Sequence, residues 1–463
     1  MCSSKSAITI LVLVFSSIFL ILLSGLIGLV LTQLKLASRE VAFNQALHIA
    51  EAGIDYYRWH LAHAPNDFQD GTGQPGPYIH EYKDPEGKLI GKFSLNIIPP
   101  TACEPAVIIE STGWTIKFPD LKRTIKVKYS KEALAKFAFL TNDDVWFGED
   151  EELKGPFHSN GGIRMDGEQN SLATSAKETY ICRPIHGCFY QQKPGIWGEG
   201  EGQEKGLWQF PVPSLDFNLI SQDLAFIKEE AKTKGIYLSP TNSLGYHLVF
   251  KSNGTIDIFK VTKLKPEVWG YDGEKWVFES NDIESQTLIQ NVPLPANCGP
   301  IFVEDKVWVK GDVVGRTTLA AAKFPELPQN YVNIIISGNI NYLTKNSVLG
   351  LIAQKDILIP LYSPNKLEIK AVLLAQKGHV FRYYYPRWWE EPYRTYAIRD
   401  YIETYGALIT NTVWTFTWVD WTGEVVSGYK ETEMAYDSSL TFNPPPHFPT
   451  SGGFKIISWE EYR

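Results

Sequence analysis

The first 63 residues place the strongest constraint on the fold, because an apolar run there continues into an amphipathic pattern without a break. No charged side chain occurs from Ala7 to Leu34, and about 20 apolar residues are enough for a helix to cross the hydrocarbon core of a membrane. The run is longer than the apolar core of a signal peptide, and no A-x-A cleavage site closes it. We therefore predict a membrane-spanning helix over residues 1–34.

The apolar residues that follow lie on one face of a helix. Their spacings are 7, 4, 3, 4, 3 and 4, for Leu36, Phe43, Leu47, Ala50, Ile54, Tyr57 and Leu61. The first proline of the chain is Pro65, so nothing before it prevents one continuous helix. At 1.5 Å per residue, this helix would be roughly 85 Å long, with its first half in lipid and its second half beside a folded domain.

Short strand patterns follow the predicted helix. Between turn-rich segments the chain alternates, and Ile125, Val127 and Tyr129 fall on one face while Lys126 and Lys128 fall on the other. These patterns predict a small antiparallel sheet. Residues 35–132 would then form a helical stalk with this sheet packed against it.

The segment just after the apolar run has a recognisable pattern. Residues 42–53 read AFNQALHIAEAG, or A-F-x-x-A-x-x-x-A-E-A-G. The pattern, together with the preceding apolar run, resembles the N-terminus of type IV pilins and especially of PilX-like minor pilins. The leader MCSSKSAITI departs from the usual prepilin pattern, because it lacks a Gly-Phe pair and the first glutamate of the chain is Glu40. A plain membrane anchor with a helical stalk is the alternative.

The resemblance implies partners. Pilin-like subunits assemble by packing their N-terminal helices together, with membrane lipid around the span before assembly. Ser24 and Gly28 form a small-xxx-small face that permits close helix packing, although glycine is also common in ordinary membrane spans. The resemblance adds Phe43, Leu47 and Glu51 to the expected assembly surface.

From about residue 133 the pattern changes to short apolar strands separated by Gly or Asn. Three segments occupy equivalent places after such strands: Gly338-Asn339-Ile340, Lys355-Asp356-Ile357 and Lys377-Gly378-His379-Val380. Loose repetition of strand–turn–strand units predicts a right-handed β-solenoid with insertions. An irregular β-sandwich is the alternative. The main helical pattern in this region is an amphipathic insertion near residues 216–234.

The predicted fold class is therefore α+β. A long transmembrane helix (1–34) leads into a pilin-like stalk and antiparallel sheet (35–132). A large, mainly β domain (133–463) follows, with the helical insertion near 216–234.

Five cysteines are present. Cys2 precedes the apolar run, which leaves four cysteines for an oxidising outer compartment. Cys182 and Cys188 are close in sequence and form the first predicted disulfide, and Cys103 with Cys298 follows by elimination. A zinc site is the competing interpretation, but the sequence has no C-x-x-C pair and no H-x₃₋₅-H pair.

Charge provides a weaker guide to location. The formal net charge is −8, so a nucleic-acid partner is not indicated. Lys5 lies before the span, while Lys35 and Arg39 lie after it, which leaves the orientation ambiguous. Because large domains are translocated despite such charges, we expect a single-pass protein of the inner (cytoplasmic) membrane. Its N-terminus would be inside and residues 35–463 outside.

Catalytic patterns are weak. Polysaccharide-cleaving solenoids need clustered aspartates with a nearby histidine and a basic residue, and the best candidates are Asp143, Asp144, His158 and Arg164. The aspartates are also an ordinary turn signal. No G-x-S-x-G elbow and no phosphate-binding loop occurs. The acidic run Glu149-Asp150-Glu151-Glu152 lacks regular calcium-loop spacing. We therefore expect no catalytic residue, no cofactor and no metal.

Aromatic residues make up 13% of the chain, and many gather between Phe381 and Tyr396. This segment is predicted to be an insertion whose rings bind a sugar or dock a protein, since aromatic residues and arginine dominate interface hot spots. The alternative is that half of these rings only cover the core. The candidates are Tyr383, Tyr384, Trp388, Trp389, Tyr393 and Arg387.

Together these patterns indicate a membrane-anchored, non-enzymatic envelope protein. The expected role is a structural or adhesive minor component of a type IV pilus-like filament, located at the tip, whose outer domain binds carbohydrate or another cell-surface ligand. A membrane-tethered β-helix protein that binds or processes polysaccharide is the alternative. A surface adhesin outside any pilus system is a third.

Overall fold

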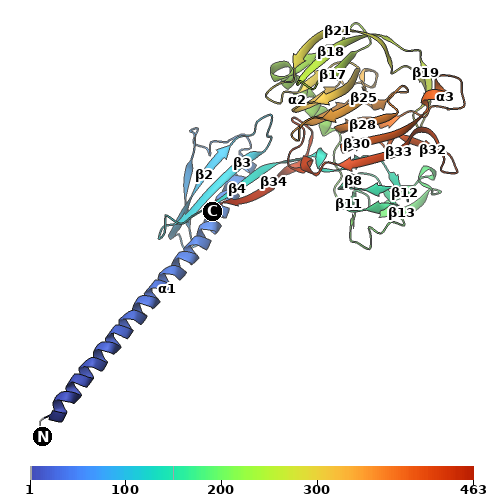
Figure 1. The fold of residues 1–463 in the computed structure, drawn as a ribbon. Coiled ribbons are helices and arrows are strands. Elements are labelled where there is room, and N and C mark those ends of the chain that lie inside the picture. The colour runs from blue at the N-terminus through green and yellow to red at the C-terminus, as the bar shows by residue number, and fades with distance from the viewer. Residues whose placement is uncertain (1–2, 150, 463) are drawn as a thin grey trace. The chain divides into compact units, whose positions relative to one another are not determined.

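A computed structural model describes residues 3–149 and 151–462 of the chain, which divide into two compact units (Figure 1). Unit 1 comprises Met1–Pro100, Ala106–Ser130 and Ile456–Arg463, and unit 2 comprises Thr101–Pro105 and Lys131–Lys455. The larger unit is therefore inserted, in sequence, into the smaller one. The sequence analysis placed 133–463 in one domain, whereas unit 1 takes in the end of the last strand from Ile456 onward.

Helix α1 (Ser3–His63) is continuous over 61 residues, as predicted. It ends two residues before Pro65, the first residue that cannot donate a backbone hydrogen bond. From Ile8 to Leu36 every side chain of the helix is exposed. The helix is long and apolar enough to cross a membrane, by length and composition.

Unit 1 is completed by an antiparallel sheet packed on the second half of α1. The strand order is β1-β2-β3-β4-β34, and the bounds are β1 (Tyr78–Lys83), β2 (Leu89–Ile98), β3 (Val107–Thr115), β4 (Lys122–Ala133) and β34 (Thr450–Tyr462). Strand β3 alternates buried and half-buried side chains along its whole length, as expected for a sheet with one face on a helix. The predicted small sheet is therefore present, with an added C-terminal strand.

The contact between helix and sheet is unusually close. A Cβ atom built on Gly113 of β3 would overlap the Ala46 carbonyl oxygen and the Ala50 backbone nitrogen of α1. Ala42, Ala46 and Ala50 recur every four residues and are all buried, so small side chains let the helix backbone approach the strand. The buried face continues through Ile49, Gly53, Ile54, Tyr57 and Leu61.

This face differs slightly from the predicted one. Leu36 is exposed, and Phe43 and Leu47 are only partly buried at the edge of the contact. The sequence prediction was based on the large apolar residues, whereas alanine and glycine lie at the centre of the contact between α1 and β3. Alanine is a weak hydrophobic signal, but it permits the shortest distance between backbones.

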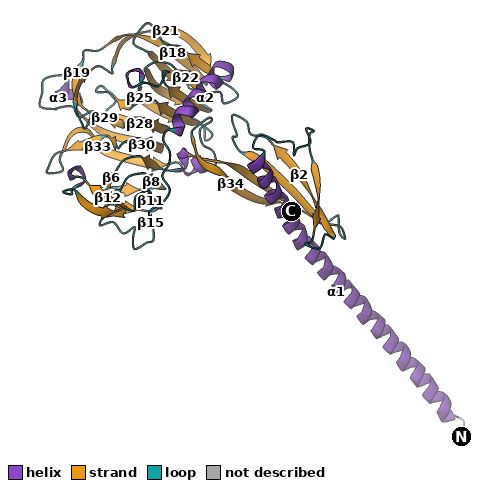
Figure 2. Cartoon of the chain, turned by 180° about the vertical axis from the view of Figure 1, so that it is seen from behind, coloured by secondary structure: helices purple, strands orange, loops and turns teal. Residues whose placement is uncertain are grey.

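Unit 2 is built around ladders of parallel strands, seen edge-on in Figure 2. In the first ladder each strand pairs in parallel with the next. Its strands, in spatial order, are β16 (Ile236–Leu238), β22 (Ile301–Val303), β24 (Arg316–Ala321), β26 (Val348–Ala353), β28 (Lys366–Ala375), β30 (Ile398–Thr410), β5 (Phe139–Thr141), β8 (Phe157–Ser159), β11 (Ala173–Ser175) and β15 (Trp208–Gln209).

A second parallel ladder runs beside the first. Its strands are β17 (Tyr246–Phe250), β23 (Val307–Val313), β25 (Ile334–Tyr342), β27 (Ile357–Ile359), β29 (Val380–Arg382) and β31 (Trp414–Thr415). A third parallel ladder is formed by the first half of β28, the first half of β30 and β33 (Val425–Tyr436). In it, β28 pairs with β30, and β30 pairs with β33. Between residues 236 and 415 the strands of the first and second ladders thus alternate along the chain.

Shorter elements complete unit 2. Two further parallel groups are β6 (Val145–Phe147) with β9 (Ile163–Met165) and β14 (Ile196–Trp197), and β7 (Glu152–Leu153) with β10 (Glu168–Gln169). The antiparallel insertions are β12 (Thr179–Cys182) with β13 (Gln191–Pro194), β18 (Thr255–Leu264) with β21 (Ile283–Pro293), β19 (Val268–Tyr271) with β20 (Trp276–Glu279), and β32 (Thr417–Val419) with β33. Helix α3 (Tyr393–Tyr396) is a single turn.

The order of the first ladder shows how the chain winds. Strand β5 lies between β30 and β8, so the early segment 139–209 stacks beyond the late segment 236–410. Helix α2 (Leu219–Lys234) links the two segments. The chain therefore starts in the middle of the stack, runs to one end, and is carried by α2 to the other end.

Helix α2 covers the outer face of the first ladder. Its buried residues Ile220, Leu224, Ile227 and Ala231 share a core cluster with residues of β22, β24, β26, β28, β30 and β5. Sixteen residues at 1.5 Å per residue span about 24 Å, or about five strand spacings of 4.8 Å. The predicted insertion near 216–234 is thus a helix as expected, and its role is the return connection.

This cover explains the apolar runs in the sequence. Every residue of β26 is buried, because one face points into the main core and the other lies under α2. Strands buried on both faces lose the alternation of polar and apolar residues. The predicted β-rich character of the chain beyond residue 133 is confirmed.

Both predicted cysteine pairs lie at bonding distance. The S–S distance is 2.09 Å for Cys182–Cys188 and 2.20 Å for Cys103–Cys298. Cys182 ends β12, and Cys188 precedes β13, so that bond closes a hairpin. The second bond joins positions 195 residues apart in sequence and holds the short segment Thr101–Pro105 within unit 2.

The close packing of α1 on β3 predicts a large effect of one methyl group. Gly113→Ala would push the strand away from the helix and cost about 1–3 kcal/mol, so amide hydrogens of residues 42–61 should exchange faster. Gly148→Ala is the control, because no atom lies within 4 Å of its added Cβ. Equal exchange protection in both variants, measured by mass spectrometry, would contradict this packing.

Candidate functional site

The apolar half of α1 is the first functional surface. Its large side chains are exposed, with Phe19 at 64% and Ile21 at 71%, and such a continuous apolar surface must be covered by lipid or protein. The polar side chains within it donate back to their own helix: the hydroxyls of Ser24 and Thr32 reach the carbonyl oxygens of Leu20 and Gly28 at 2.7 and 2.8 Å. Both hydroxyls are therefore hydrogen-bonded within the helix and need no partner from an apolar environment.

The predicted assembly residues occupy different environments. Ser24 and Gly28 lie on the exposed half, and no atom lies within 4 Å of a Cβ built on Gly28. Phe43 and Leu47 are partly buried, and the guanidinium of Arg123 on β4 lies 4.2 Å from the Phe43 ring centroid. Glu51 is half-buried and pairs with His48 at 2.9 Å. Only the first two therefore lie on the fully exposed stretch of the helix.

A second surface is made of aromatic rings on unit 2. We use the name aromatic surface for the rings of Trp276, Tyr384, Trp388, Trp389 and Trp418. Trp276 and Trp389 are stacked, with ring centroids 5.8 Å apart and planes inclined by 15°. Tyr384 lies 6.0 Å from each of Trp276, Trp388 and Trp418. The rings form a connected network.

Three insertions contribute to this aromatic surface. Trp276 begins β20, Trp418 is in β32, and the other rings come from the loop before α3. A backbone bridge joins two of the insertions, since Tyr271 and Tyr384 exchange N–H···O bonds of 3.0 Å. The Trp418 indole N–H also donates to the Arg382 carbonyl oxygen at 2.9 Å. These bonds fix the positions of the rings.

Two of the predicted surface residues are buried instead. Tyr383 and Tyr393 are 6% and 9% exposed and belong to a core cluster under the aromatic surface. The Tyr383 hydroxyl donates to Glu279 at 2.8 Å, and the Tyr393 hydroxyl oxygen accepts the Trp269 backbone N–H at 2.6 Å. Their role is to support the β19–β20 hairpin, so they are removed from the binding candidates.

The two arginines Arg382 and Arg387 of this segment also differ in burial. Arg382 is fully buried and donates to the carbonyl oxygens of Leu361, Tyr396 and Ala397 at 2.6–3.1 Å. Arg387 is exposed and pairs with Glu424 at 3.3 Å. Of the predicted set, Tyr384, Trp388, Trp389 and Arg387 remain at the surface.

The sequence analysis missed Trp276 and Trp418. Trp276 is more than a hundred residues from Trp389 in sequence, and only the pairing of the β19–β20 hairpin with the later loop brings them together. The nearest sequence signal was the general excess of tryptophan outside the Phe381–Tyr396 segment.

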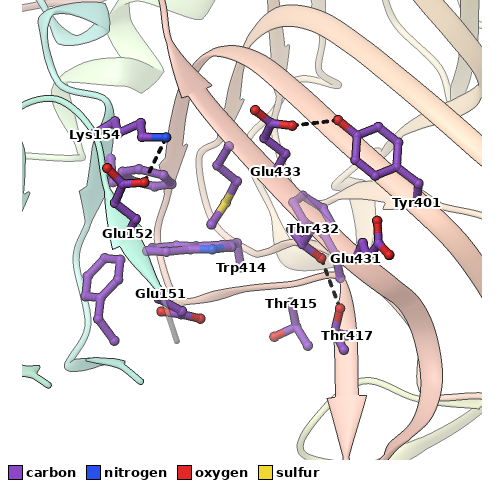
Figure 3. Close-up of a pocket in the computed structure, with 14 residues that line it drawn as sticks. Glu151, Glu152, Lys154, Tyr401, Trp414, Thr415, Thr417, Glu431, Thr432 and Glu433 are labelled. Atoms are coloured by element: carbon purple, nitrogen blue, oxygen red, sulfur yellow. Dashed lines mark hydrogen bonds and ion pairs between the residues drawn. The ribbon is translucent and has the colours of Figure 1, made fainter. Parts of the chain in front are cut away.

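A pocket of about 560 Å³ lies beside β33 and β7 (Figure 3). Trp414 forms one wall and stacks on Phe139, with ring centroids 4.9 Å apart. Two of its glutamates are engaged: Glu152 pairs with Lys154 at 2.8 Å, and Glu433 accepts the Tyr401 hydroxyl at 2.8 Å. Its other acidic lining residues are Glu151 and Glu431.

The acidic run predicted as a weak calcium candidate contributes to this pocket through Glu151 and Glu152. Asp150 lies outside the described residues, and Glu149 does not line the pocket. Among the residues that the structure describes, no group of three or more His, Cys, Asp or Glu side chains is placed to hold a metal ion.

The weak catalytic candidates are held in structural contacts. His158 bonds to Thr174 at 2.9 Å and Asn160 at 3.0 Å, and burial lowers the pKa of its imidazole. Asp144 accepts the Gly162 backbone N–H at 2.8 Å. Asp143 pairs with Arg183, and Arg164 pairs with Asp166. Asp144 also lies 3.6 Å from Arg183, so the two aspartates share one arginine, whereas His158 and Arg164 contact other residues.

No family model and no curated protein matches the chain. Among solved structures it is similar to the competence-associated pilin ComZ from Thermus thermophilus, with 12% sequence identity and a TM-score of 0.32. The match covers 91% of this chain and 97% of that chain. A score this low does not establish a common fold.

The assignment of some aromatic residues to the core and others to the surface can be tested by measuring the free energy of unfolding of variants. Tyr393→Ala should lower the free energy of unfolding by about 3–5 kcal/mol, as for a buried aromatic residue. Trp388→Ala should change it by less than about 0.5 kcal/mol, because the side chain is 62% exposed. Urea titration of both variants measures this, and a similar cost at the two positions would contradict the assignment.

Proposed function

We propose that this chain is a membrane-anchored, pilin-like surface protein whose outer unit binds carbohydrate. The observation that carries the proposal is the single helix α1, which is fully exposed and apolar over its first half and packed on a small antiparallel sheet over its second half. A helix of this kind serves both as a membrane span and as an assembly element. The PilX-like pattern at residues 42–53 supports the same role.

The proposed location follows from α1. Residues 8–34 would span the inner membrane once, with the N-terminus inside and both units outside. The two disulfide-bonded pairs support an oxidising outer compartment for unit 2. On assembly the span would exchange lipid for the helices of other pilin-like subunits.

The outer unit is proposed to be a right-handed β-solenoid with insertions. The alternation of strands of its first and second parallel ladders along the chain supports this architecture. A domain of more than 300 residues would not repeat easily along a thin filament that is held together by its helices. We therefore propose a minor subunit, at the filament tip, rather than a major one.

Carbohydrate is the proposed ligand of the aromatic surface. Its rings are flat, held in place by backbone and side-chain bonds, and accompanied by the exposed Arg387 and its partner Glu424. Sugars with equatorial hydroxyls present apolar C–H faces that stack on such rings, while charged side chains bond their hydroxyls.

Removing two rings should weaken binding. Trp388→Ala with Trp389→Ala should lower affinity for β-linked glucan and N-acetylglucosamine oligosaccharides at least about tenfold, or ~1.4 kcal/mol, on an oligosaccharide array. Trp421→Ala is the control, because this ring is 95% exposed and lies outside the defined surface. Unchanged binding by the double variant, or no binding by the parent protein, would contradict the carbohydrate proposal.

Assembly through α1 can be tested separately. Gly28→Ile places a β-branched side chain on the small-residue face and should weaken helix self-association by about 1 kcal/mol, or about fivefold, in a transmembrane association reporter. Leu26→Ile is the control, since two residues turn a helix by about 200° and place position 26 on the opposite side. Equal signals from both variants would show that this face is not used.

A further inference from the structure

A second pocket lies on unit 2 away from the aromatic surface. Its volume is about 540 Å³, and the residues that line it include His247, Ser337 and Gln286. His247 is on β17, Ser337 is on β25 and Gln286 is on β21. The three residues are separated by 39 and 90 positions in sequence, so only the strand pairing brings them together.

The sheet order explains how they meet. Strand β17 pairs with β18 on one side and β23 on the other. Beyond these lie β21, which pairs with β18, and β25, which pairs with β23. His247 therefore sits at the centre of five strands, and Gln286 and Ser337 reach it from the strands two places away on either side.

Ser337 lies on a bulge of β25. The register pairs Val309 with Ile336 and then Gly311 with Ile340, so Lys310 alone faces Ser337, Gly338 and Asn339. Bulges re-aim side chains and are frequent beside active sites. The bulge turns the Ser337 hydroxyl toward the imidazole of His247.

The hydrogen bonds fix the roles of the two ring nitrogens. His247 Nδ1 lies 2.7 Å from Gln286 Oε1, and an amide oxygen only accepts, so Nδ1 carries the proton. Nε2 is then an acceptor, and Ser337 Oγ lies 3.2 Å from it. The same hydroxyl can donate instead to the Val309 carbonyl oxygen at 3.3 Å, so its one hydrogen is shared between two acceptors. The base is thus within hydrogen-bond reach of the nucleophile on one side and of the group that orients it on the other.

The ring is held neutral as well as oriented. His247 is 4% exposed, and burial lowers the pKa of its imidazole to about 4, with a smaller contribution in the same direction from the charge of Lys310. Near neutral pH the imidazole is thus neutral, with Nε2 unprotonated.

We propose that Ser337, His247 and Gln286 form a nucleophilic site that hydrolyses short-chain acyl esters of polar alcohols. Ser337 is the nucleophile, His247 is the general base and acid, and Gln286 is a positioning residue that fixes the tautomer. The proposal goes beyond carbohydrate binding and does not depend on it. It adds an activity that the sequence analysis did not expect.

The reaction balances without a cofactor. Ser337 Oγ forms a bond to the ester carbonyl carbon while its proton passes to His247 Nε2. The ester C–O bond then breaks, and the alcohol leaves with that proton, which gives an acyl-serine. Water attacks the acyl-serine through the same base, and the products are one carboxylic acid, one alcohol and the free serine hydroxyl.

The lining selects the substrate class. Lys310 lines the same pocket, and its ammonium would stabilise the oxyanion of the tetrahedral intermediate. The remaining lining groups are largely polar, and include Lys265, Asn281, Asp282 and Glu284. A polar lining suits a hydroxylated alcohol portion with a small acyl group, rather than a long lipid chain.

The first test uses the full-length protein in detergent with 4-nitrophenyl acetate and a fluorophosphonate probe. Ser337→Ala should reduce the hydrolysis rate at least ~100-fold, as expected for loss of a nucleophile, and should remove the probe adduct that mass spectrometry locates at Ser337. Ser252→Ala, an exposed serine in the β17–β18 turn, should change neither readout. An unchanged rate in Ser337→Ala, or no native-state adduct at Ser337 in the parent protein, overturns the proposal.

A second set of variants tests the positioning role. Gln286→Ala should lower kcat about tenfold or more with little change in KM, because the base loses its orientation. Gln286→Glu restores an acceptor for Nδ1–H and should recover most of the rate. A kcat in Gln286→Ala equal to that of the parent protein would show that the residue has no part in the reaction. Circular dichroism of each variant checks that the fold is retained.

Discussion

The close packing of α1 on β3 is the contact on which unit 1 depends. Alanines at every fourth position of the helix contact a glycine of the strand. The two backbones are so close that a methyl group on this glycine would overlap the helix backbone. The same helix is apolar and uncovered for its first half. One element thus changes environment along its length, from a surface that requires lipid or other helices to a surface sealed by its own sheet.

In unit 2 the corresponding constraint is the connection made by α2, which carries the chain from one end of the first ladder to the other. Because segment 139–209 stacks beyond segment 236–410, the connection must span the later strands, and an amphipathic helix of matching length does so while covering the first ladder. On the second ladder, Ile335, Leu358 and Phe381 share a core cluster with the single-turn helix α3 and with residues of the insertions. The aromatic surface is built from insertions, whereas the His247 pocket combines His247 and Ser337 of the ladder itself with Gln286 of the β18–β21 insertion.

Much of this plan could be predicted from the sequence, because the signals are local. Hydrophobic periodicity indicated α1, the insertion that is α2 and the β-rich character of the outer unit, and cysteine counting indicated both disulfides. The sites depend on distant register and could not be predicted in the same way. Nothing local to His247 points to Ser337, and Tyr383 and Trp388 look alike in sequence although one is buried and the other exposed.

The most direct test of the central claim, that α1 is an assembly helix as well as an anchor, is fractionation of the native cell. Surface filaments would be sheared off, and an antibody to unit 2 used on the filaments and on washed membranes. The account predicts that the protein is found with the sheared filaments as well as in the membrane pool. Recovery in the membrane fraction alone, from cells that produce filaments, would contradict it and leave α1 as an anchor only.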